Sequence, residues 1–492
     1  MARIGTVDER FQSFNIEMVE VTGGRFWRPY GKQVDALLKA QPSAGPVGMD
    51  PALYRQRPPI DLTNPRLRKL AAALGPAYVR VSGTWANTTY FQDSDDAAPS
   101  NPPAGFNGVL TRRQWKDVVD FSRAADARIV TSFATSAGTR DAAGVWTPAQ
   151  ARRFLAYTKS IGGSIAAAEY MNEPTFAEIG GAPKGYDAAA YARDIAVFRP
   201  FAKQAAPDMV ILGPGSVGEG ISLVPAGMAR GQLKTEDLLT AAGPAFDAFS
   251  YHFYGALSKR CAGMVPGAGT TPEDALSEQW LARTGRVEAF YAGLRDRFAP
   301  GKPLWLTETG ETACGGDPWA SDFIDTFRYL NQLGTLAKRG VQVVMHNTLN
   351  ASDYALIDES TLNPRPNYWA AVLWRRLRGT TVLNAGESHT PGLYLYADCL
   401  RDKPGGVAIL AINADKTGAH EVDLPAKSMR YSLTSNDLMS PTVQPNGVAL
   451  DLTPDGDLPA IHGAAQPAGR ISLAPVSITF LEVSGAHNAA CR

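Results

Sequence analysis

The chain has 492 residues, of which 45% are hydrophobic, and its 48 basic side chains balance its 48 acidic ones. A chain of this length and composition buries a large core and is expected to hold more than one domain. The charge balance excludes a global basic field of the kind that binds nucleic acid, and no apolar run is long enough to cross a membrane.

Short apolar runs rich in strand formers alternate with helix-like segments up to residue 347. The runs span residues 14–18, 78–82, 128–133, 165–172, 209–213, 246–254, 304–308 and 341–347. Helix start signals lie between them, such as the capping-box pattern of 111–114 and Thr147 as an N-cap before Pro148. This alternation, repeated eight times, predicts an α/β fold, a (β/α)8 barrel.

After residue 383 the pattern changes to short alternating runs separated by Pro, Gly, Asn and Asp turns. The runs span residues 393–396, 406–412, 419–424, 448–452, 471–473 and 477–483. This pattern predicts an antiparallel β-sandwich. We therefore expect a catalytic barrel over 11–380 and a C-terminal sandwich domain over 381–492, to which a strand from residues 1–10 could be added.

Two glutamates close predicted strands and are followed by turn signals. Glu173 lies in Asn172-Glu173-Pro174 after the fourth strand, and Glu308 ends the seventh. The carboxyl ends of barrel strands carry the reacting groups, and glycosidic cleavage needs one protonated and one ionised carboxyl group. We predict Glu173 as general acid/base and Glu308 as nucleophile, about 5 Å apart, in a retaining reaction. The proline is expected to hold Glu173 in an extended conformation.

Neighbouring side chains are candidates for supporting roles. Asn172 can donate a hydrogen bond to the sugar 2-hydroxyl. A hydroxyl from Tyr254, at the end of the sixth strand, can hydrogen-bond Glu308 and keep it ionised, with His252 beside it. The alternative for these two residues is aromatic core packing with a satisfied buried histidine.

Other carboxylates and a metal site compete with this pair as explanations. Glu169 shares a strand face with Glu173 but lies deeper, which favours a buried structural role, whereas Glu311 is the best substitute nucleophile. A metal-dependent hydrolase needs several His, Asp and Glu at strand ends, and His252 and His346 are too few. No metal and no cofactor are implied.

The four cysteines are too few and too scattered for a disulfide scaffold or a zinc knuckle. Cys491 could tie down the end of the chain by a bridge to Cys399, and four free thiols, with Cys261 and Cys314 included, are the alternative.

The start of the chain carries no signal peptide. Either the protein is cytoplasmic, or this is the mature form of a secreted or periplasmic protein.

The Asn-Glu-Pro motif with a glutamate on the seventh strand resembles the retaining glycoside hydrolases of clan A. The finer pattern resembles glycoside hydrolase family 79, the heparanases and β-glucuronidases, over nearly the whole chain. The stretches that carry the resemblance are residues 11–17, 67–84, 252–254, 367–369 and 378–380.

The resemblance implies the same roles for Glu173 and Glu308. It also implies a uronic acid before the cleaved bond, with its carboxylate held by the backbone amides of Gly315 and Gly316 and by the hydroxyl of Tyr368. The residues implied to bind sugar hydroxyls are Glu17 and Thr84, and the Cys399–Cys491 pair matches a family disulfide. The chain departs from the family at Cys314, where an aromatic residue is expected, and at Asp317, where some heparanases have glycine.

The leading hypothesis is a retaining endo-β-glucuronidase that acts on heparan sulfate or a related glycosaminoglycan as a monomer, with no nucleic acid and no integral membrane segment involved. The first alternative is an exo-β-glucuronidase that removes terminal glucuronate, and the more distant one is a non-catalytic glycan-binding protein. Endo cleavage of a sulfated chain calls for basic residues on the rim. The candidates are Arg140, Lys184, Lys259 and Arg260.

Overall fold

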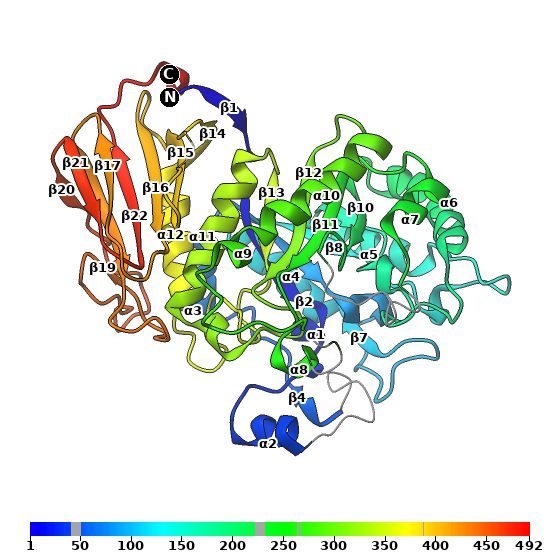
Figure 1. The fold of residues 1–492 in the computed structure, drawn as a ribbon. Coiled ribbons are helices and arrows are strands. Elements are labelled where there is room, and N and C mark those ends of the chain that lie inside the picture. The colour runs from blue at the N-terminus through cyan, green and yellow to red at the C-terminus, as the bar shows by residue number, and fades with distance from the viewer. Residues whose placement is uncertain (41–50, 222–231, 263–264, 266, 387) are drawn as a thin grey trace.

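The structure is a computed structural model that describes residues 1–40, 51–221, 232–262, 265, 267–386 and 388–492. Figure 1 shows a helix-covered barrel beside an all-β region, and the two ends of the chain lie next to each other on the all-β side. Among these described residues, none of the helices combines the length and the apolar character that a membrane crossing requires.

Eight parallel strands close the barrel, and each coincides with a predicted run to within a few residues. They are β2 (Gln12–Glu17), β5 (Ala77–Ser82), β8 (Ala127–Ser132), β9 (Ile165–Glu169), β10 (Val210–Ser216), β11 (Ala248–Tyr254), β12 (Leu304–Gly310) and β13 (Val343–His346). β13 pairs with β2, so the sheet has no free edge. The predicted (β/α)8 barrel is confirmed.

Helices cover the outside of the barrel. The longer ones are α3 (Pro65–Ala72), α4 (Arg112–Ala124), α5 (Ala149–Ser160), α6 (Ala188–Ala205), α7 (Thr235–Ala242), α10 (Arg283–Phe298), α11 (Phe323–Lys338) and α12 (Pro366–Leu377). The predicted capping box at α4 is present, since Thr111 and Gln114 bond each other's backbone N–H groups. At α5 the expectation was one residue early, because Pro148 is the N-cap and the helix begins at Ala149.

Short elements build the rim at the carboxyl ends of the barrel strands. They are α1 (Met18–Thr22), β3 (Gly24–Trp27), α2 (Lys32–Ala40), β4 (Tyr54–Arg57), β6 (Thr89–Gln92), β7 (Gly108–Thr111), α8 (Lys259–Ala262) and α9 (Glu278–Leu281). β3 and β4 form an antiparallel ribbon, and β6 pairs with β7 in parallel. In Figure 1, α2, β4 and α8 lie together below the barrel.

The C-terminal region is antiparallel. Its strands are β14 (Arg378–Leu383), β15 (Leu393–Leu400), β16 (Val407–Asn413), β17 (His420–Leu424), β18 (Ser428–Thr434), β19 (Gln444–Pro445), β20 (Ala464–Gln466), β21 (Gly469–Leu473) and β22 (Ser477–Val483). The main sheet has the order β1-β14-β15-β16-β22-β18-β19, and β17 pairs with β21. Buried side chains of both sheets, such as Leu393 and Ile471, share one core, as a sandwich requires.

Two details of this region depart from the sequence prediction or extend it. The run 448–452 forms no strand, and Val448 is exposed. The first strand, β1 (Arg3–Thr6), pairs antiparallel with β14, so residues 3–6 join the C-terminal sheet. The division of the chain into domains at residue 380 stays a prediction.

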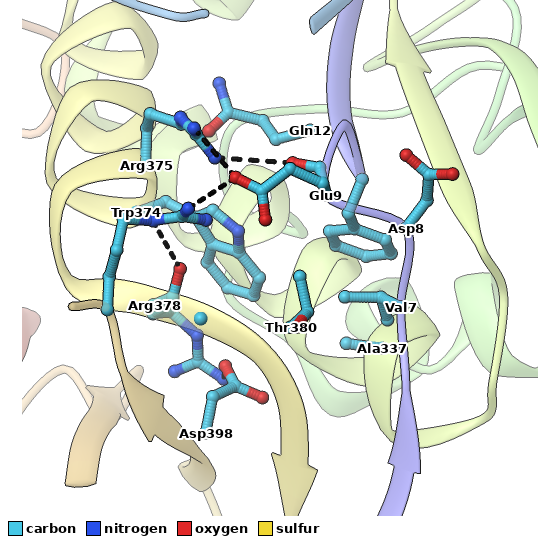
Figure 2. Close-up of a pocket in the computed structure, with 13 residues that line it drawn as sticks. Val7, Asp8, Glu9, Gln12, Ala337, Trp374, Arg375, Arg378, Thr380 and Asp398 are labelled. Atoms are coloured by element: carbon cyan, nitrogen blue, oxygen red, sulfur yellow. Dashed lines mark hydrogen bonds and ion pairs between the residues drawn. The ribbon is translucent and has the colours of Figure 1, made fainter. Parts of the chain in front are cut away.

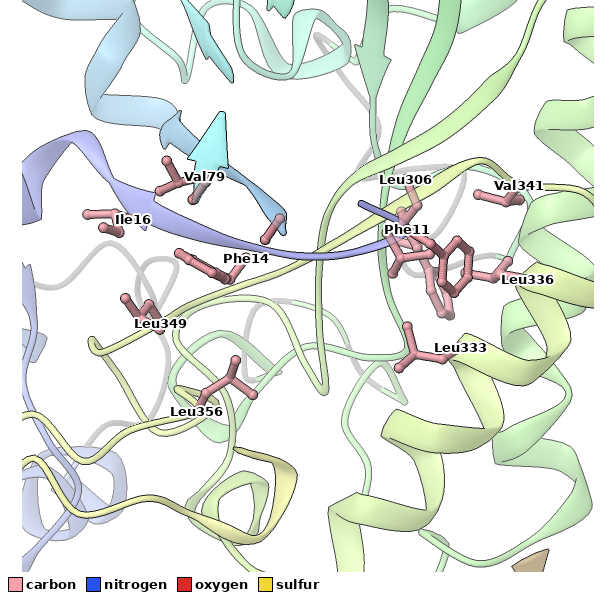
Figure 3. Close-up of a cluster of buried hydrophobic side chains, with 14 of the residues drawn as sticks. Phe11, Phe14, Ile16, Val79, Leu306, Leu333, Leu336, Val341, Leu349 and Leu356 are labelled. Carbon is pink, nitrogen blue, oxygen red and sulfur yellow. The ribbon is translucent and has the colours of Figure 1, made fainter. Parts of the chain in front are cut away.

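A large apolar cluster joins the barrel to its helices. Figure 3 shows Phe11, which precedes β2, beside Leu306 of β12 and Leu333 and Leu336 of α11. Phe14 of β2 lies toward Val79 of β5 in the same cluster. α11 is buried along almost its whole length because it lies between the barrel and the C-terminal sheet. This helix therefore fixes the position of the sheet against the barrel.

Ion pairs hold the junction of barrel and sheet (Figure 2). Glu9 accepts from Arg375 at 3.0 Å and from Arg401 at 2.6 Å, which connects the first loop, α12 and the sheet. Deeper in the junction, Arg378 and Asp398 form an ion pair in which both side chains are buried. A buried pair of this kind is costly to break, because the remaining charge loses its partner.

Candidate active site

Glu173 and Glu308 lie at the same end of the barrel. Glu308 is inside β12, in register with His252 of β11, and Glu173 follows the end of β9 by four residues. Glu173 has φ 49° and ψ 63°, which is the left-handed region and not the extended conformation that Pro174 led us to expect. A non-glycine residue in this region is strained, and such strain gathers at functional sites.

The two carboxyl groups face each other across a buried histidine. One carboxylate oxygen from each glutamate and one ring nitrogen of His252 all lie within 4.8 Å of one another. Glu173 Oε1 is 3.1 Å from His252 Nδ1. Glu308 Oε1 accepts from the Tyr254 hydroxyl at 2.8 Å, and its Oε2 accepts from Arg80 at 2.7 Å. The predicted closeness of the glutamates, and of Tyr254 to Glu308, is present in this geometry.

Burial and neighbouring charge set different protonation states for these groups. Burial raises the pKa of Glu173, and the negative charge of Glu308 raises it further. For His252, burial alone would lower the pKa, but the charge of Glu308 and hydrogen bonds to Glu169 and Glu173 raise it to about 9. At neutral pH the site thus holds a cationic imidazolium between Glu173, whose pKa is raised, and Glu308, which accepts from Tyr254 and Arg80.

Arg80 on β5 links the side chains of the site, and it was not predicted from the sequence. Its side chain is 1% exposed. It donates to Glu169 at 3.2 and 2.9 Å, to Glu308, and to Asn172 Oδ1 at 2.7 Å, and it lies 3.2 Å from His252 Nε2. An arginine in the middle of an apolar strand was the available signal, because such a residue is buried only with charged partners.

Asn172 is fixed from two sides. The side chain of Asn87 accepts from its backbone N–H at 2.8 Å and donates to its backbone carbonyl at 2.9 Å. Since Arg80 occupies its Oδ1, its amide nitrogen is the group left to donate, and no acceptor for it occurs in the described part of the chain. This orientation suits the expected contact with a substrate hydroxyl.

Glu17 lies close to the catalytic pair. Its Oε1 accepts from the amide nitrogen of Asn347 at 2.9 Å, and that nitrogen also lies 3.0 Å from the Tyr254 hydroxyl and 3.1 Å from that of Tyr354. Burial, with the charge of Glu308, raises the pKa of Glu17 well above its usual range. A Cβ on Gly83 would come within 1.6 Å of Glu17 Oε2, so this carboxyl group requires glycine there.

Thr84 follows Gly83 and leads away from the catalytic pair. It is half-buried and lines a groove of about 490 Å³ together with Arg25 and Trp85. The ring of Trp85 packs edge-on against Phe26, with their centroids 4.9 Å apart. The groove thus begins one residue past Gly83, which lies against Glu17.

The predicted glycines lie in a tight loop after β12. Cys314, Gly315 and Gly316 have φ 65°, 84° and 80°, and only glycine adopts this region without strain. A Cβ on Gly316 would come within 3.0 Å of Tyr354. The amide N–H groups of both glycines have no acceptor among the residues that the structure describes.

Tyr368 is not in the site. It is fully buried in α12, and its hydroxyl donates to the carbonyl of Leu70 in α3 at 2.9 Å, in the outer layer of the fold. Tyr354, in the loop after β13, lies where that tyrosine was expected: it packs on Gly316 and stacks on Tyr254 with centroids 6.3 Å apart. In the sequence, the position of Tyr354 just after the end of a strand was the signal that could have indicated a site residue.

The rival carboxylates have structural surroundings. Glu169 is buried and accepts from Arg80, from Ser250 at 2.8 Å and from Thr307 at 2.7 Å, as the sequence analysis expected. Glu311 is buried as well and accepts from the backbone N–H of Asp317 at 3.0 Å. Its partners are therefore those of the loop and not those of the catalytic pair.

The group Glu173, His252 and Glu308 has a spacing that could hold a metal ion. Its chemistry does not fit one, because His252 with a pKa of about 9 is a cation at neutral pH and Arg80 adds a second positive charge. A metal ligand must be a neutral imidazole, so a metal ion would have to displace the proton of His252, and it would meet repulsion from the guanidinium of Arg80.

All four cysteines are paired. Cys399 and Cys491 form a disulfide, as predicted, and Cys261 is joined to Cys314.

Two of the four predicted rim cations are absent from the rim. Arg140 pairs with Asp194 at 2.9 Å with only 4% of its side chain exposed, and Arg260 is completely buried. Lys184 and Lys259 are exposed as expected.

The chain is similar to known proteins in sequence and in fold. The chain is 24% identical over 489 residues to heparanase-like protein 1 of Arabidopsis thaliana, covering 88% of this chain and 86% of that protein. It is 30% identical over 271 residues to the heparanase of Gallus gallus, covering 51% and 50%. A solved 4-O-α-L-rhamnosyl-β-D-glucuronidase from Fusarium oxysporum 12S shares the fold with a TM-score of 0.63 at 12% identity, covering 98% and 97%.

The family assignment rests on a longer match. A model described as glycosyl hydrolase family 79, N-terminal domain, matches residues 58–334, which run from before α3 into α11 and include both glutamates. Because this match covers more than half of the 492 residues, the chain belongs to glycosyl hydrolase family 79.

Proposed function

We propose that the chain is a retaining hydrolase of β-D-glucuronide linkages, with Glu173 as general acid/base and Glu308 as nucleophile. The observation that carries this proposal is the carboxyl pair, whose facing oxygens lie within 4.8 Å. Retaining glycosidases place the two groups about 5 Å apart, whereas inverting enzymes need roughly 6.5–9.5 Å to admit a water molecule.

The surroundings of each glutamate match its proposed step. Glu173, whose pKa is raised, donates its proton to the leaving oxygen while Glu308, held by Tyr254 and Arg80, attacks the anomeric carbon. The attack turns the Glu308 carboxylate into an uncharged ester. This removes the charge that raised the pKa of Glu173, so Glu173 then accepts a proton from the water that hydrolyses the ester.

The loop after β12 supports recognition of a uronic acid. The amide N–H groups of Gly315 and Gly316, and the hydroxyl of Tyr354, whose ring lies against Gly316, provide neutral donors for a carboxylate. Neutral donors leave the protonation of the nearby glutamates undisturbed, whereas a lysine would shift it. Relatives named heparanase and heparanase-like protein support a glucuronate-containing glycan as substrate.

Endo action on heparan sulfate is the leading form of the proposal, and removal of terminal glucuronate is the alternative. The groove beside Thr84 and Trp85 favours endo action because it offers space for the glycan to continue. The burial of Arg140 and Arg260 leaves fewer cations for sulfate groups, which favours weakly sulfated stretches. Two disulfides support a secreted or periplasmic location, because such bonds persist in oxidising compartments.

The test follows the size of heparan sulfate chains by gel filtration and the release of chromophore from an aryl β-glucuronide. Glu173→Gln and Glu308→Gln are compared with Glu178→Gln, a control five residues past the acid whose side chain bonds the N–H of Gly185. We expect the wild type and the control to shorten the polymer and both site variants to be inactive. Chromophore release without shortening would establish the exo alternative.

Azide rescue assigns the two roles. With a small residue at position 308, azide replaces the nucleophile and gives the α-glucuronyl azide, whereas with a small residue at 173 it attacks the covalent intermediate and gives the β-product. We expect the α-azide from Glu308→Gly and the β-azide from Glu173→Ala, as resolved by NMR. The opposite pairing of products and variants would refute the roles proposed for the two glutamates.

A further inference from the structure

Arg260 lies at the meeting point of four loops around the proposed uronate site. It belongs to α8, after β11, and none of its side chain is exposed. One guanidinium nitrogen donates to the carbonyls of Cys314 at 3.1 Å and Gly316 at 3.0 Å. The other donates to the carbonyl of Arg28 at 2.8 Å and to Asp353 at 2.7 Å. A single side chain thus holds the loops after β2, β11, β12 and β13.

The carbonyls on both sides of the glycines point toward this arginine. The carbonyl of Gly315 is held as well, by the backbone N–H of Asp353 at 3.1 Å. In a trans peptide, the carbonyl and the following N–H point in opposite directions. By holding the carbonyl of Cys314, Arg260 therefore directs the N–H of Gly315 away from itself, and the contact of Asp353 does the same for the N–H of Gly316.

The fit around Gly315 leaves no room for a side chain at this position. A Cβ on Gly315 would come within 2.9 Å of the Arg260 guanidinium and 2.8 Å of the Trp27 ring. The guanidinium also lies 3.9 Å from the centre of the Tyr30 ring. Its charge is paired with Asp353, so it serves to hold the loop more than to attract an anion from a distance.

A covalent bond reinforces the same contact. Cys261, the neighbour of Arg260, is joined to Cys314, the first residue of the turn. Ser258 adds a hydroxyl that donates to the carbonyl of Cys314 at 3.1 Å, and the backbone of Lys259 donates to Asp317 at 2.8 Å. α8 and the residue before it are therefore bonded to both ends of the glycine turn.

We propose that Arg260, locked by the Cys261–Cys314 disulfide, is a positioning residue that orients the Gly315 and Gly316 amides and so sets the preference for a uronic acid over a sugar without a carboxylate. This inference rests on the proposed function. It assigns to Arg260 a role that does not involve contact with sulfate groups on the rim.

Arg260→Met is the main test, because it keeps the length of the side chain and removes every donor. On an aryl β-glucuronide we expect KM to rise about tenfold or more, as when donors to a charged group are lost, with kcat within about threefold of the wild type. Competitive inhibition by an aryl β-D-xyloside, which has the same ring without the carboxylate, is expected to be unchanged. Arg260→Lys keeps one ammonium group for four acceptors, and its KM for the glucuronide should lie between those of the wild type and Arg260→Met.

Matched variants separate positioning from general stability. Arg140→Met removes another buried arginine, which bonds Asp194 and the carbonyl of Thr135, so it should lower stability and leave KM unchanged. Replacing Cys261 and Cys314 by alanine should raise KM for the glucuronide, and this variant carries the test if Arg260→Met does not fold. Replacing Cys399 and Cys491 by alanine should cost stability without changing KM.

The outcomes distinguish this inference from the proposed function. An unchanged KM in Arg260→Met, or equal weakening of glucuronide and xyloside, would overturn the positioning role while the wild type remained a glucuronidase. Failure of the wild-type protein to hydrolyse the glucuronide would overturn the proposed function and this inference with it.

Discussion

His252 should stabilise the barrel as a buried cation, and this contribution depends on pH. Its pKa of about 9 in the folded protein compares with 6.5 in an unfolded chain. Because folding raises this pKa, the protonated ring stabilises the folded state by about 3 kcal/mol. The contribution is fully present below pH 6.5 and is lost as the pH rises through 9. We expect the free energy of unfolding to fall by about this amount between pH 6.5 and 9.5 in the wild type relative to His252→Gln.

The measurement uses urea unfolding followed by tryptophan fluorescence, because all nine tryptophans lie between residues 27 and 374 and so report on the barrel. His346→Gln is the control: burial and the charge of Arg328 lower the pKa of His346 to about 3, so it is neutral across this range. NMR of histidine labelled with carbon-13 should show one ring titrating near pH 9. Equal pH dependence in the wild type and His252→Gln, or a midpoint at or below 6.5, would refute this account.

Two further substitutions test the site and the junction. Tyr254→Phe should lower kcat/KM on an aryl glucuronide by about 10- to 100-fold, since it removes a hydrogen bond to the ionised nucleophile Glu308, and unchanged kinetics in a folded variant would contradict that role. Asp398→Asn should lower the free energy of unfolding by about 3–5 kcal/mol, because it leaves Arg378 buried without its counter-charge. Asp423→Asn, in an exposed pair, is the control and should leave the urea midpoint unchanged, so equal effects would argue against a special cost at the junction.

The barrel could be predicted because its strands are continuous apolar runs, the pattern of strands buried on both faces. The C-terminal sheet was harder to predict from the sequence. β14 begins with Arg378, whose burial makes sense only with Asp398 of β15 as its ion-pair partner, and the sequence does not show that pairing. The run 448–452 has the alternation of a strand, yet Val448 is exposed and only tertiary context decides against a strand.

The catalytic pair could be predicted because strand ends meet at one end of a barrel whatever the details of the loops. Which residues surround the pair depends on the direction in which each side chain points. Tyr354 and Tyr368 both follow the eighth strand, and only the structure shows that Tyr368 bonds Leu70 in the outer layer. Arg80 was missed because its partners come from three other strands and loops, far apart in sequence.

The pairing of β1 with β14 has a consequence for synthesis. β1 leaves the ribosome long before its partner, which begins at Arg378, so the strand stays unpaired while the whole barrel is made. Its edge groups are available for contacts with other chains during this time. Conversely, a chain without residues 1–6 would leave the edge of β14 open. We expect such a truncation to reduce yield through aggregation before it affects catalysis, because β1 lies far from the carboxyl ends of the barrel strands (Figure 1).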